Sequence, residues 1–377
     1  IYTPTHTLSL HDALPIYKAV IEDGLGSTPF NKLSTMAKFA PQAMKIQAFN
    51  SSYKMAKKFF NDFRHRFMFS FHPLFIGGNP FRVPAIYLMI SYLEKAGGVW
   101  FTKGGMYSLV EAFGKLFNEL GGKVKTSTPV EKILTQKGKA IGVKAGGQEF
   151  LSDLVVSNAD LTHTYKDLTG KNERRKWTDS KLEKSKYSMS TFLLYLGVKK
   201  KYPELLHHTL ILSHRYKELV EDIFDNLILP EDFSMYVHCP TRTDPDMAPE
   251  GGDSIYVLVP VANLRADIDW DKKSREMANK IINYLEADFN MVGLRDNIVV
   301  EEMFTPEDFK EKRNSAYGTP WGLEPTLTQS AYFRPHNRSE DIKNLYFVGA
   351  GTHPGAGLPG VMLSAEATER LIIEDFE

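Results

Sequence analysis

The chain has 377 residues with 46 basic and 46 acidic side chains, and it is 42% hydrophobic and 12% aromatic. Because its formal charge is zero, no overall field draws the protein to nucleic acid, and we expect no nucleic-acid partner. The charged and aromatic contents are those of a folded chain, and the length predicts about two domains. The single cysteine, Cys239, excludes an internal disulfide and a multi-cysteine zinc or iron–sulfur site.

The first residues differ from the rest of the chain. Residues 3–16 (TPTHTLSLHDALPI) have no periodicity that continues into the following sequence. We interpret residues 1–16 as a translated sequencing adapter, to be excluded from fold reasoning, with a short native leader as the alternative. The most apolar stretch, residues 255–264, has about half of the roughly 20 residues that a membrane-spanning helix needs, so none is expected.

A basic helical segment follows at residues 31–60. Its apolar side chains recur at three- and four-residue spacing, and the pattern is interrupted at Pro41. This segment contains six lysines and no acidic residue, the next one being Asp62: Lys32, Lys38, Lys45, Lys54, Lys57 and Lys58. A cationic amphipathic surface of this kind suits an anionic membrane, and a solvated helical face is the alternative.

Residues 67–100 are dense in aromatics and broken by glycine and proline, which is typical of an apolar cavity or of core packing. A helix is predicted from Met106, and Gly121 and Gly122 end it. Short strands are then predicted at residues 123–126, 130–136, 139–145 and 154–157. The central part predicts strands at residues 191–198, 234–239 and 255–261, with helices near 216–224 and at 273–289.

The C-terminal part predicts a strand, a glycine-rich loop and a helix. Residues 344–348 (NLYFV) form the apolar run, residues 349–360 the loop, and residues 361–373 the helix. This order presents backbone N–H groups and the positive end of a helix dipole to an anion, such as a phosphate or a flavin edge. A glycine-rich connection without a ligand is the alternative.

Other motifs do not identify a site. Residues 355–360 match G-x-G-x-x-G, but that fingerprint needs a βαβ unit of about 30 residues, and only 17 residues follow Gly360. The zinc-protease, α/β-hydrolase and P-loop signatures do not occur in the sequence. His72, His238 and His353 are isolated along the chain, so structural roles are expected for them and no metal site is predicted.

Six blocks of the sequence carry a resemblance to a known family. They are FSFHPLFIGGNPFRVPAIYLMISYLE, GVWFTKGGM, VVSNAD, TRTDPDMAPEG, GLEPTLTQSAYFRPHNRS and NLYFVGAGTHPGAGLPGVMLSAEAT. Together, and in this order, they resemble the bacterial phytoene desaturases, which are FAD-dependent enzymes of the amine-oxidase-like flavoprotein superfamily. The likeness runs from about residue 17 to Glu377. The family's opening dinucleotide-binding unit has no counterpart in this sequence.

The resemblance implies an α/β fold of the two-domain FAD-linked oxidoreductase type (glutathione-reductase/amine-oxidase-like) that lacks its N-terminal βαβ dinucleotide-binding unit. Residues 99–160 and 330–377 would form the FAD domain. Residues 17–98 and 161–329 would form the substrate and membrane-binding domain.

The resemblance also implies site residues. The positions expected to contact FAD are Val130, on the adenine side, and Gly349, Ala350, Gly351, Thr352, Gly357, Gly360, Val361 and Met362. No catalytic base is identified. The polar candidates are Arg82, Arg334 and His336, for which the anchoring of loops is the alternative role.

The implied reaction is the successive dehydrogenation of phytoene towards lycopene, with a quinone or oxygen as electron acceptor. An apolar C40 polyene would bind between the aromatic block and the central strands, and the enzyme would be cytoplasmic and attached to a bacterial membrane surface. A C30 desaturase, an isomerase and a ketolase-like oxidase remain as alternatives. A non-catalytic lipid- or membrane-binding fragment is a further alternative, because most contacts to the ADP part of FAD would be missing; we expect the chain to be inactive as this fragment.

Overall fold

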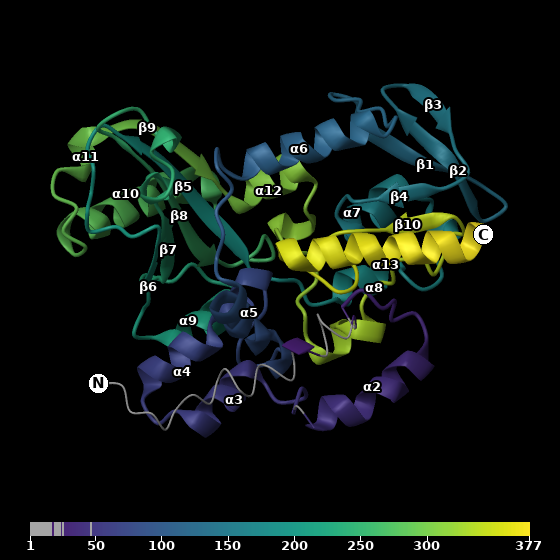
Figure 1. The fold of residues 1–377 in the computed structure, drawn as a ribbon, viewed down its shortest axis with the longest axis horizontal. Helices are drawn as coiled ribbons and strands as arrows, with labels where there is room; N and C mark the ends of the chain where they lie inside the picture. The colour runs from purple at the N-terminus through teal and green to yellow at the C-terminus, as the bar shows by residue number, and fades with distance from the viewer. Residues whose placement is uncertain (1–16, 19–23, 25, 46) are drawn as a thin grey trace. The chain divides into compact units, whose positions relative to one another are not determined.

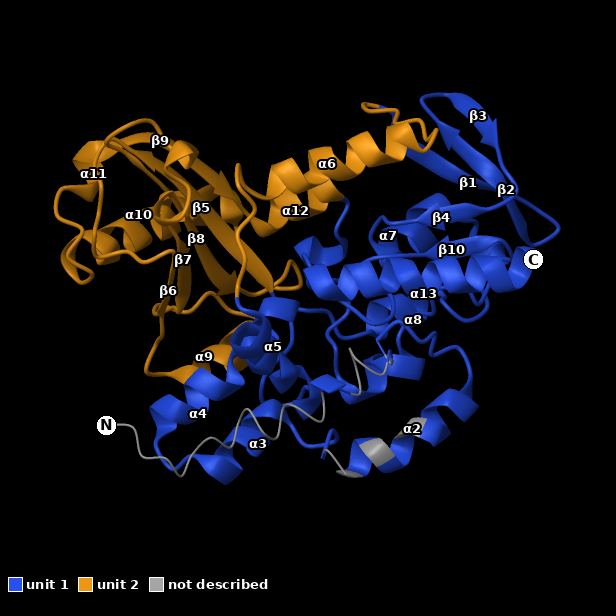
Figure 2. Ribbon diagram, in the orientation of Figure 1, with its two compact units in different colours: residues 1–98, 128–189, 314–377 blue, residues 99–127, 190–313 orange. Residues whose placement is uncertain are grey.

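The computed structural model describes residues 17–18, 24, 26–45 and 47–377, so the segment interpreted as adapter-derived lies outside the described residues. The described chain is mixed α/β, as predicted. It forms two compact units, coloured separately in Figure 2. Unit 1 comprises the described residues up to position 98 together with residues 128–189 and 314–377, and unit 2 comprises residues 99–127 and 190–313.

Unit 2 is built on a five-stranded antiparallel sheet with the order β6-β7-β8-β5-β9 (Figure 1). The strands are β5 (Ser190–Val198), β6 (His208–Ile211), β7 (Met235–His238), β8 (Asp253–Val261) and β9 (Ile298–Phe304). The helices are α6 (Met106–Glu119), α9 (Tyr216–Glu221), α10 (Trp270–Ala287), α11 (Leu294–Asn297) and α12 (Pro306–Arg313).

The core of unit 2 lies between one face of this sheet and α10. Along β8, buried residues alternate with partly exposed ones, because successive side chains of a strand point to opposite faces. Trp270, the first residue of α10, is 1% exposed and stacks on Phe192 of β5 with ring centroids 5.9 Å apart. Full burial of one such side chain contributes about 2 kcal/mol, so this sheet and helix stabilise each other.

Unit 1 contains two smaller sheets. Its strands are β1 (Val130–Gln136), β2 (Lys139–Ala145), β3 (Gln148–Leu151), β4 (Val155–Ser157) and β10 (Leu345–Phe347). Strands β1, β2 and β3 form an antiparallel sheet, whereas β4 and β10 pair in parallel. The α-helices are α2 (Leu33–Lys45), α3 (Ser52–Phe59), α4 (Phe63–Ser70), α5 (Met89–Gly97), α7 (Leu161–His163), α8 (Asp179–Lys184) and α13 (Leu358–Phe376).

Short 3-10 and π-type turns connect these elements. In unit 1 they are His72–Ile76, Ala85–Leu88, Thr164–Leu168, Lys171–Glu173, Ala316–Gly318, Leu327–Gln329 and Ala331–Phe333. In unit 2 they are Asp222–Asn226, Pro240–Arg242 and Pro245–Met247. No helix among the described residues combines the length and the apolar character that crossing a bilayer requires.

The parallel pair places the C-terminal strand in the core of unit 1. Leu345 and Phe347 of β10 are 0% and 2% exposed, and Thr368 of α13 donates a hydrogen bond to the carbonyl oxygen of Phe347 at 2.9 Å. The predicted order of strand, glycine-rich loop and helix is therefore confirmed. The helix starts three residues before the predicted position, because Leu358, Pro359 and Gly360 already belong to α13.

Two local predictions are wrong. Residues 123–126 form no strand, and all four are exposed, so they lack the buried face that stabilises a strand. Pro41 does not interrupt the helix, since α2 continues through it to Lys45. A proline removes one backbone donor and bends a helix without having to end it.

The compact units do not follow the predicted domain boundaries. Residues 161–189 and 314–329 belong to the same unit as the C-terminal strand, and α6 belongs to the unit of the five-stranded sheet. The predicted domains were defined by cofactor and substrate roles rather than by compactness. That division by role stays a prediction.

Candidate functional site

The N-terminus of α13 forms the centre of the candidate site. Gly357 precedes the helix, Pro359 lies in its first turn, and no described side chain caps its first amides. Residues 357–359 are exposed. These amides and the positive end of the helix dipole can therefore receive a negatively charged or electron-rich group.

The glycine-rich loop before α13 is shaped by close packing. Gly349 has a φ of +98°, and a Cβ atom there would lie 2.3 Å from Oδ1 of Asn158. At Gly360 a Cβ atom would lie 2.7 Å from the carbonyl oxygen of Gly355. Both positions therefore require glycine. The close approach of Gly349 to Asn158 also lets the C-terminal block pack against the VVSNAD block.

Arg334 clamps this loop from within unit 1. Its side chain is buried, with Nε donating to the carbonyl oxygen of Thr352 at 2.9 Å and Nη2 to that of Ala350 at 2.6 Å. Burial lowers the pKa of Arg334, yet an arginine side chain stays protonated in proteins. The guanidinium therefore fixes two loop carbonyls and keeps a positive charge beside the loop.

Asn337 is a second anchor, which the sequence analysis missed. Its buried Nδ2 donates to the carbonyl oxygen of His353 at 3.0 Å and to Oγ of Ser364 at 3.1 Å. The same Ser364 hydroxyl accepts the amide of Gly349 at 3.1 Å. Asn337 stands inside the FRPHNRS block, but no periodicity or spacing marks it, because its partners follow 16 and 27 residues later in the chain.

His353 lies in the loop itself and is 7% exposed. Its ring contacts Phe30 with centroids 5.0 Å apart. Burial, with a smaller contribution from the charge of Arg334, lowers the pKa of His353 to about 3. The imidazole is therefore uncharged at neutral pH, so Arg334 supplies the positive charge of this loop.

Arg82 is held by a buried carboxylate. Its Nε lies 2.9 Å from Oε1 of Glu324, and its Nη2 lies 2.8 Å from Oε2. The Glu324 side chain is fully buried, and its Oε1 also accepts the amide of Asn79 at 3.2 Å. This ion pair joins the NPFR and GLEP blocks. The side chain of Arg82 is thus engaged in holding two loops together.

His336 belongs to a charged network. Its Nε2 donates to the carbonyl oxygen of Tyr332 at 2.9 Å, and its Nδ1 lies 3.1 Å from Oε1 of Glu340. Burial lowers the pKa of His336, although Glu340 acts in the opposite direction. Glu340 also accepts hydrogen bonds from Lys176 and from the indole of Trp177.

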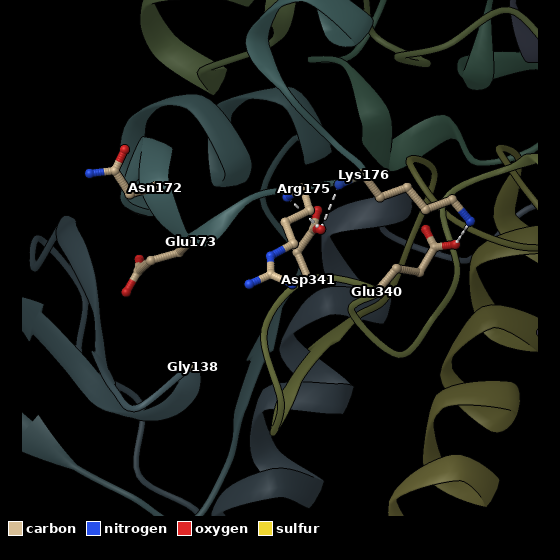
Figure 3. A pocket seen from close by; sticks show the side chains of 7 residues that line it. All are labelled: Gly138, Asn172, Glu173, Arg175, Lys176, Glu340 and Asp341. Atoms are coloured by element: carbon tan, nitrogen blue, oxygen red, sulfur yellow. Dashed lines mark hydrogen bonds and ion pairs between the residues drawn. The ribbon is translucent and has the colours of Figure 1, made fainter.

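A pocket of about 700 Å³ opens beside this network (Figure 3). Apart from Gly138, the residues that line it have polar or charged side chains: Asn172, Glu173, Arg175, Lys176, Glu340 and Asp341. The Asp341 carboxylate accepts the amides of Arg175 and Lys176 at 2.8 and 2.7 Å. Such a lining does not suit an apolar ligand, and the apolar substrate tunnel stays a prediction.

Eight of the nine predicted cofactor positions lie in one segment, residues 349–362. Gly349, Ala350, Gly351, Thr352 and Gly357 lie in the loop, and Gly360, Val361 and Met362 lie at the start of α13. Val130 is the first residue of β1, on a different sheet of unit 1, and is 41% exposed. Leu358 and Met362, at the start of α13, are 49% and 48% exposed. The helix end therefore offers both free backbone amides and accessible apolar side chains. This combination suits a flat ring system that becomes negatively charged when it is reduced.

Comparisons with known proteins identify the family of the chain. The model of the flavin containing amine oxidoreductase family matches residues 12–373. The phytoene desaturase (lycopene-forming) of Pseudescherichia vulneris is 44% identical over 365 residues, which cover 96% of this chain and 74% of that protein. The enzyme of the same name from Pantoea ananas is 43% identical over 379 residues, covering 99% of this chain and 77% of that protein.

Among solved structures, an oxidoreductase from Methanosarcina mazei superposes with a TM-score of 0.61 at 19% identity, over 89% of this chain and 71% of that chain. This likeness supports the fold alone. The resemblance carried by the six sequence blocks is confirmed by the relatives, and the family is one of flavin enzymes. The chain therefore belongs to the phytoene desaturases within the flavin-containing amine oxidoreductase family.

Proposed function

We propose that this chain catalyses the FAD-dependent desaturation of phytoene towards lycopene. The observation that carries the proposal is its similarity, along nearly its whole length, to enzymes named lycopene-forming phytoene desaturases. The substrate is then an apolar C40 polyene, and the reaction removes hydrogen from the saturated bonds that flank its conjugated part.

FAD is the proposed cofactor, held by the loop and by the first turn of α13. The isoalloxazine would lie against Gly349–Thr352, Gly357 and residues 360–362, with Val130 on the adenine side. When bound, the flavin supplies a hydride acceptor for a substrate C–H bond. The dipole of α13 and the charge of Arg334 favour the negative charge that accompanies reduction.

Arg82, Arg334 and His336 are proposed as positioning residues. Each of them is already engaged by a carboxylate or by backbone carbonyl oxygens within unit 1. Their contribution would be to hold the loops at a fixed distance from the substrate, which matters because hydride transfer needs close alignment of the reacting atoms.

A membrane surface and a quinone or oxygen complete the proposal. Phytoene is too apolar to be dissolved in water, so the enzyme has to take it from a lipid phase. Exposed lysines on α3 support an attachment to anionic lipid. The reduced flavin would then pass its electrons to a quinone in the same membrane or to oxygen.

The test is a reconstitution of the purified chain with FAD and phytoene in liposomes. The appearance of longer conjugated products in the visible spectrum, with consumption of a quinone or oxygen, would support the proposal and would contradict the expectation that the chain is inactive as this fragment. Arg334→Met is expected to weaken FAD binding about tenfold, equal to about 1.4 kcal/mol, because the loop carbonyls lose their clamp. Circular dichroism would show whether the variant is folded.

Arg338→Met is the matched control. Arg338 pairs with Asp375 at the other end of α13, at 2.7 Å, so the variant should bind FAD like the parent chain. Preference for a C30 substrate would assign the chain to the alternative desaturases. Isomerisation without consumption of an electron acceptor would assign the chain to the isomerases. Binding to vesicles without retention of FAD would favour the interpretation as a non-catalytic fragment.

A further inference from the structure

Three histidines of unit 2 converge at one edge of the five-stranded sheet. His208 begins β6 and pairs directly with His238, the last residue of β7. In a regular strand consecutive side chains point to opposite faces. His207, however, lies in the bend that precedes β6, and its ring reaches His208, with centroids 4.4 Å apart.

The ring nitrogens of these residues are close enough to share one ion. Nε2 of His207 lies 2.9 Å from Nε2 of His238. One ring nitrogen from each of the three histidines lies within 4.8 Å of the others. A tetrahedral ion with bonds of about 2.1 Å needs its nitrogen ligands about 3.4 Å apart. Small rotations of the three rings would therefore bring their nitrogen atoms to the spacing that a bound ion needs.

Neighbouring hydroxyl groups orient two of the rings. Nδ1 of His207 contacts the hydroxyl of Thr243, which leaves Nε2 as its nitrogen within the cluster. Nδ1 of His208 contacts the hydroxyl of Tyr236 at 2.7 Å. Hydrogen bonds to the second ring nitrogen are what fix the orientation of histidines that bind metals in proteins.

We propose that His207, His208 and His238 form a binding site for Zn²⁺. His207 and His238 are partly buried and His208 is exposed, so the ion would have three imidazole ligands and a fourth position open to water. Three neutral imidazoles are a ligand set that suits zinc, copper, iron or nickel and does not suit magnesium or calcium. The structure shows that His238, isolated along the chain, has two other histidines beside it, and the proposal departs from the sequence-based expectation of no metal site.

The site would connect the edge strand to its neighbour. β6 lies at one end of the sheet, and an edge strand is paired on one side only. An ion bound by residues of both β6 and β7 would hold the two strands together, since metal binding adds to folding free energy. The proposal is independent of the flavin and of the reaction proposed above.

The first test is titration of the full chain, free of any affinity tag and of metal, with Zn²⁺ by calorimetry. We expect one equivalent to bind and the melting temperature to rise with Zn²⁺. Co²⁺ is the spectroscopic probe, because a tetrahedral nitrogen site gives visible absorption bands that octahedral aqueous Co²⁺ has only weakly. Zinc should abolish these bands by competition.

Two variants test the ligands. His208→Gln and His238→Gln should each weaken Zn²⁺ binding by at least about tenfold, since even the outer hydrogen-bond partners of metal ligands have effects of this size. His208 is exposed on the edge strand, so its variant is expected to fold even if His238→Gln does not. His214→Gln is the matched control, because His214 is an exposed histidine of the same unit outside the cluster.

The proposal is overturned if the parent chain shows no saturable Zn²⁺ binding. Equal weakening by His214→Gln and His208→Gln, or a Co²⁺ spectrum identical to that of the aqueous ion, would overturn it as well. The three rings would then be an aromatic cluster that only packs the end of the sheet.

Discussion

A single buried carboxylate holds two distant segments of unit 1 together. Glu324 is fully buried and pairs with Arg82, whose side chain is 25% exposed. Removing one partner of a buried ion pair leaves the other charge without compensation, which typically costs 3–5 kcal/mol. We therefore expect Glu324→Gln to lower the free energy of unfolding by about 3 kcal/mol, measured by urea denaturation.

An exposed ion pair is the control for this prediction. Lys272 contacts Asp269 at 2.6 Å at the start of α10, where solvent screens both charges. Lys272→Gln should leave the urea concentration at the midpoint of unfolding unchanged. If Glu324→Gln behaved like the control, the attraction between Glu324 and Arg82 would only offset the cost of removing the two charges from water, and the pair would add nothing to the free energy of unfolding.

The surroundings of the Asp253 carboxyl group predict how the stability of unit 2 depends on pH. Burial alone would raise its pKa, but hydrogen bonds from Arg242, from the Tyr202 amide and from Thr241 together hold the pKa below its ordinary value. A carboxylate with a depressed pKa stabilises the folded state above its unfolded pKa. That contribution is lost as the pH falls through the folded pKa.

The measurement compares the parent chain with Asp253→Asn over a range of pH. At neutral pH the variant should be the less stable of the two. The difference should shrink progressively below about pH 4, where the unfolded carboxyl group already binds a proton. A difference that stayed constant with pH would contradict this assignment.

At the scale of an element, α3 is the helix to which we assign the proposed contact with a lipid surface. Lys54, Lys57 and Lys58 are exposed on it, whereas Met55 and Ala56 are buried. Each lysine near an anionic surface contributes about 1 kcal/mol of attraction. Changing all three to glutamate should therefore weaken binding to phosphatidylglycerol vesicles at least about a hundredfold in a sedimentation assay.

Another lysine run provides the control. Lys199, Lys200 and Lys201 are exposed in unit 2, and changing them to glutamate alters the net charge by the same amount. If both triple variants lost vesicle binding equally, the attraction would be a property of the whole surface charge and not of α3. Vesicles of phosphatidylcholine alone should bind neither variant nor the parent chain.

Elements with a strong local pattern could be predicted from the sequence. β1 and β2 have the predicted bounds, and α6 begins at Met106 as the Gly104-Gly105 turn indicates. β6 and β9 were not predicted. β9 carries two adjacent glutamates. Both strands lie at the ends of their sheet, where one side is open, and neither has a fully buried residue.

At the scale of the whole molecule, the six sequence blocks pair within each unit. In unit 2 the amide of Gly104 donates to the carboxylate of Asp244 at 2.7 Å, so the KGGM turn meets the TDPDM segment. In unit 1 the tail meets the VVSNAD and FRPHNRS blocks, at Gly349 and at Arg334. These contacts show that blocks far apart in the chain lie against each other within each unit.

By itself, the sequence determined the family, the α/β class, and the strand, loop and helix of the C-terminus; the cofactor positions within that loop stay a prediction. Only the tertiary structure decided which groups Arg82, Arg334 and Asn337 engage, and that His238 meets His207 and His208. The physical reason is that periodicity and turn residues report the local burial of a segment. Which distant residues touch depends on the path of the whole chain, and no local pattern encodes that path.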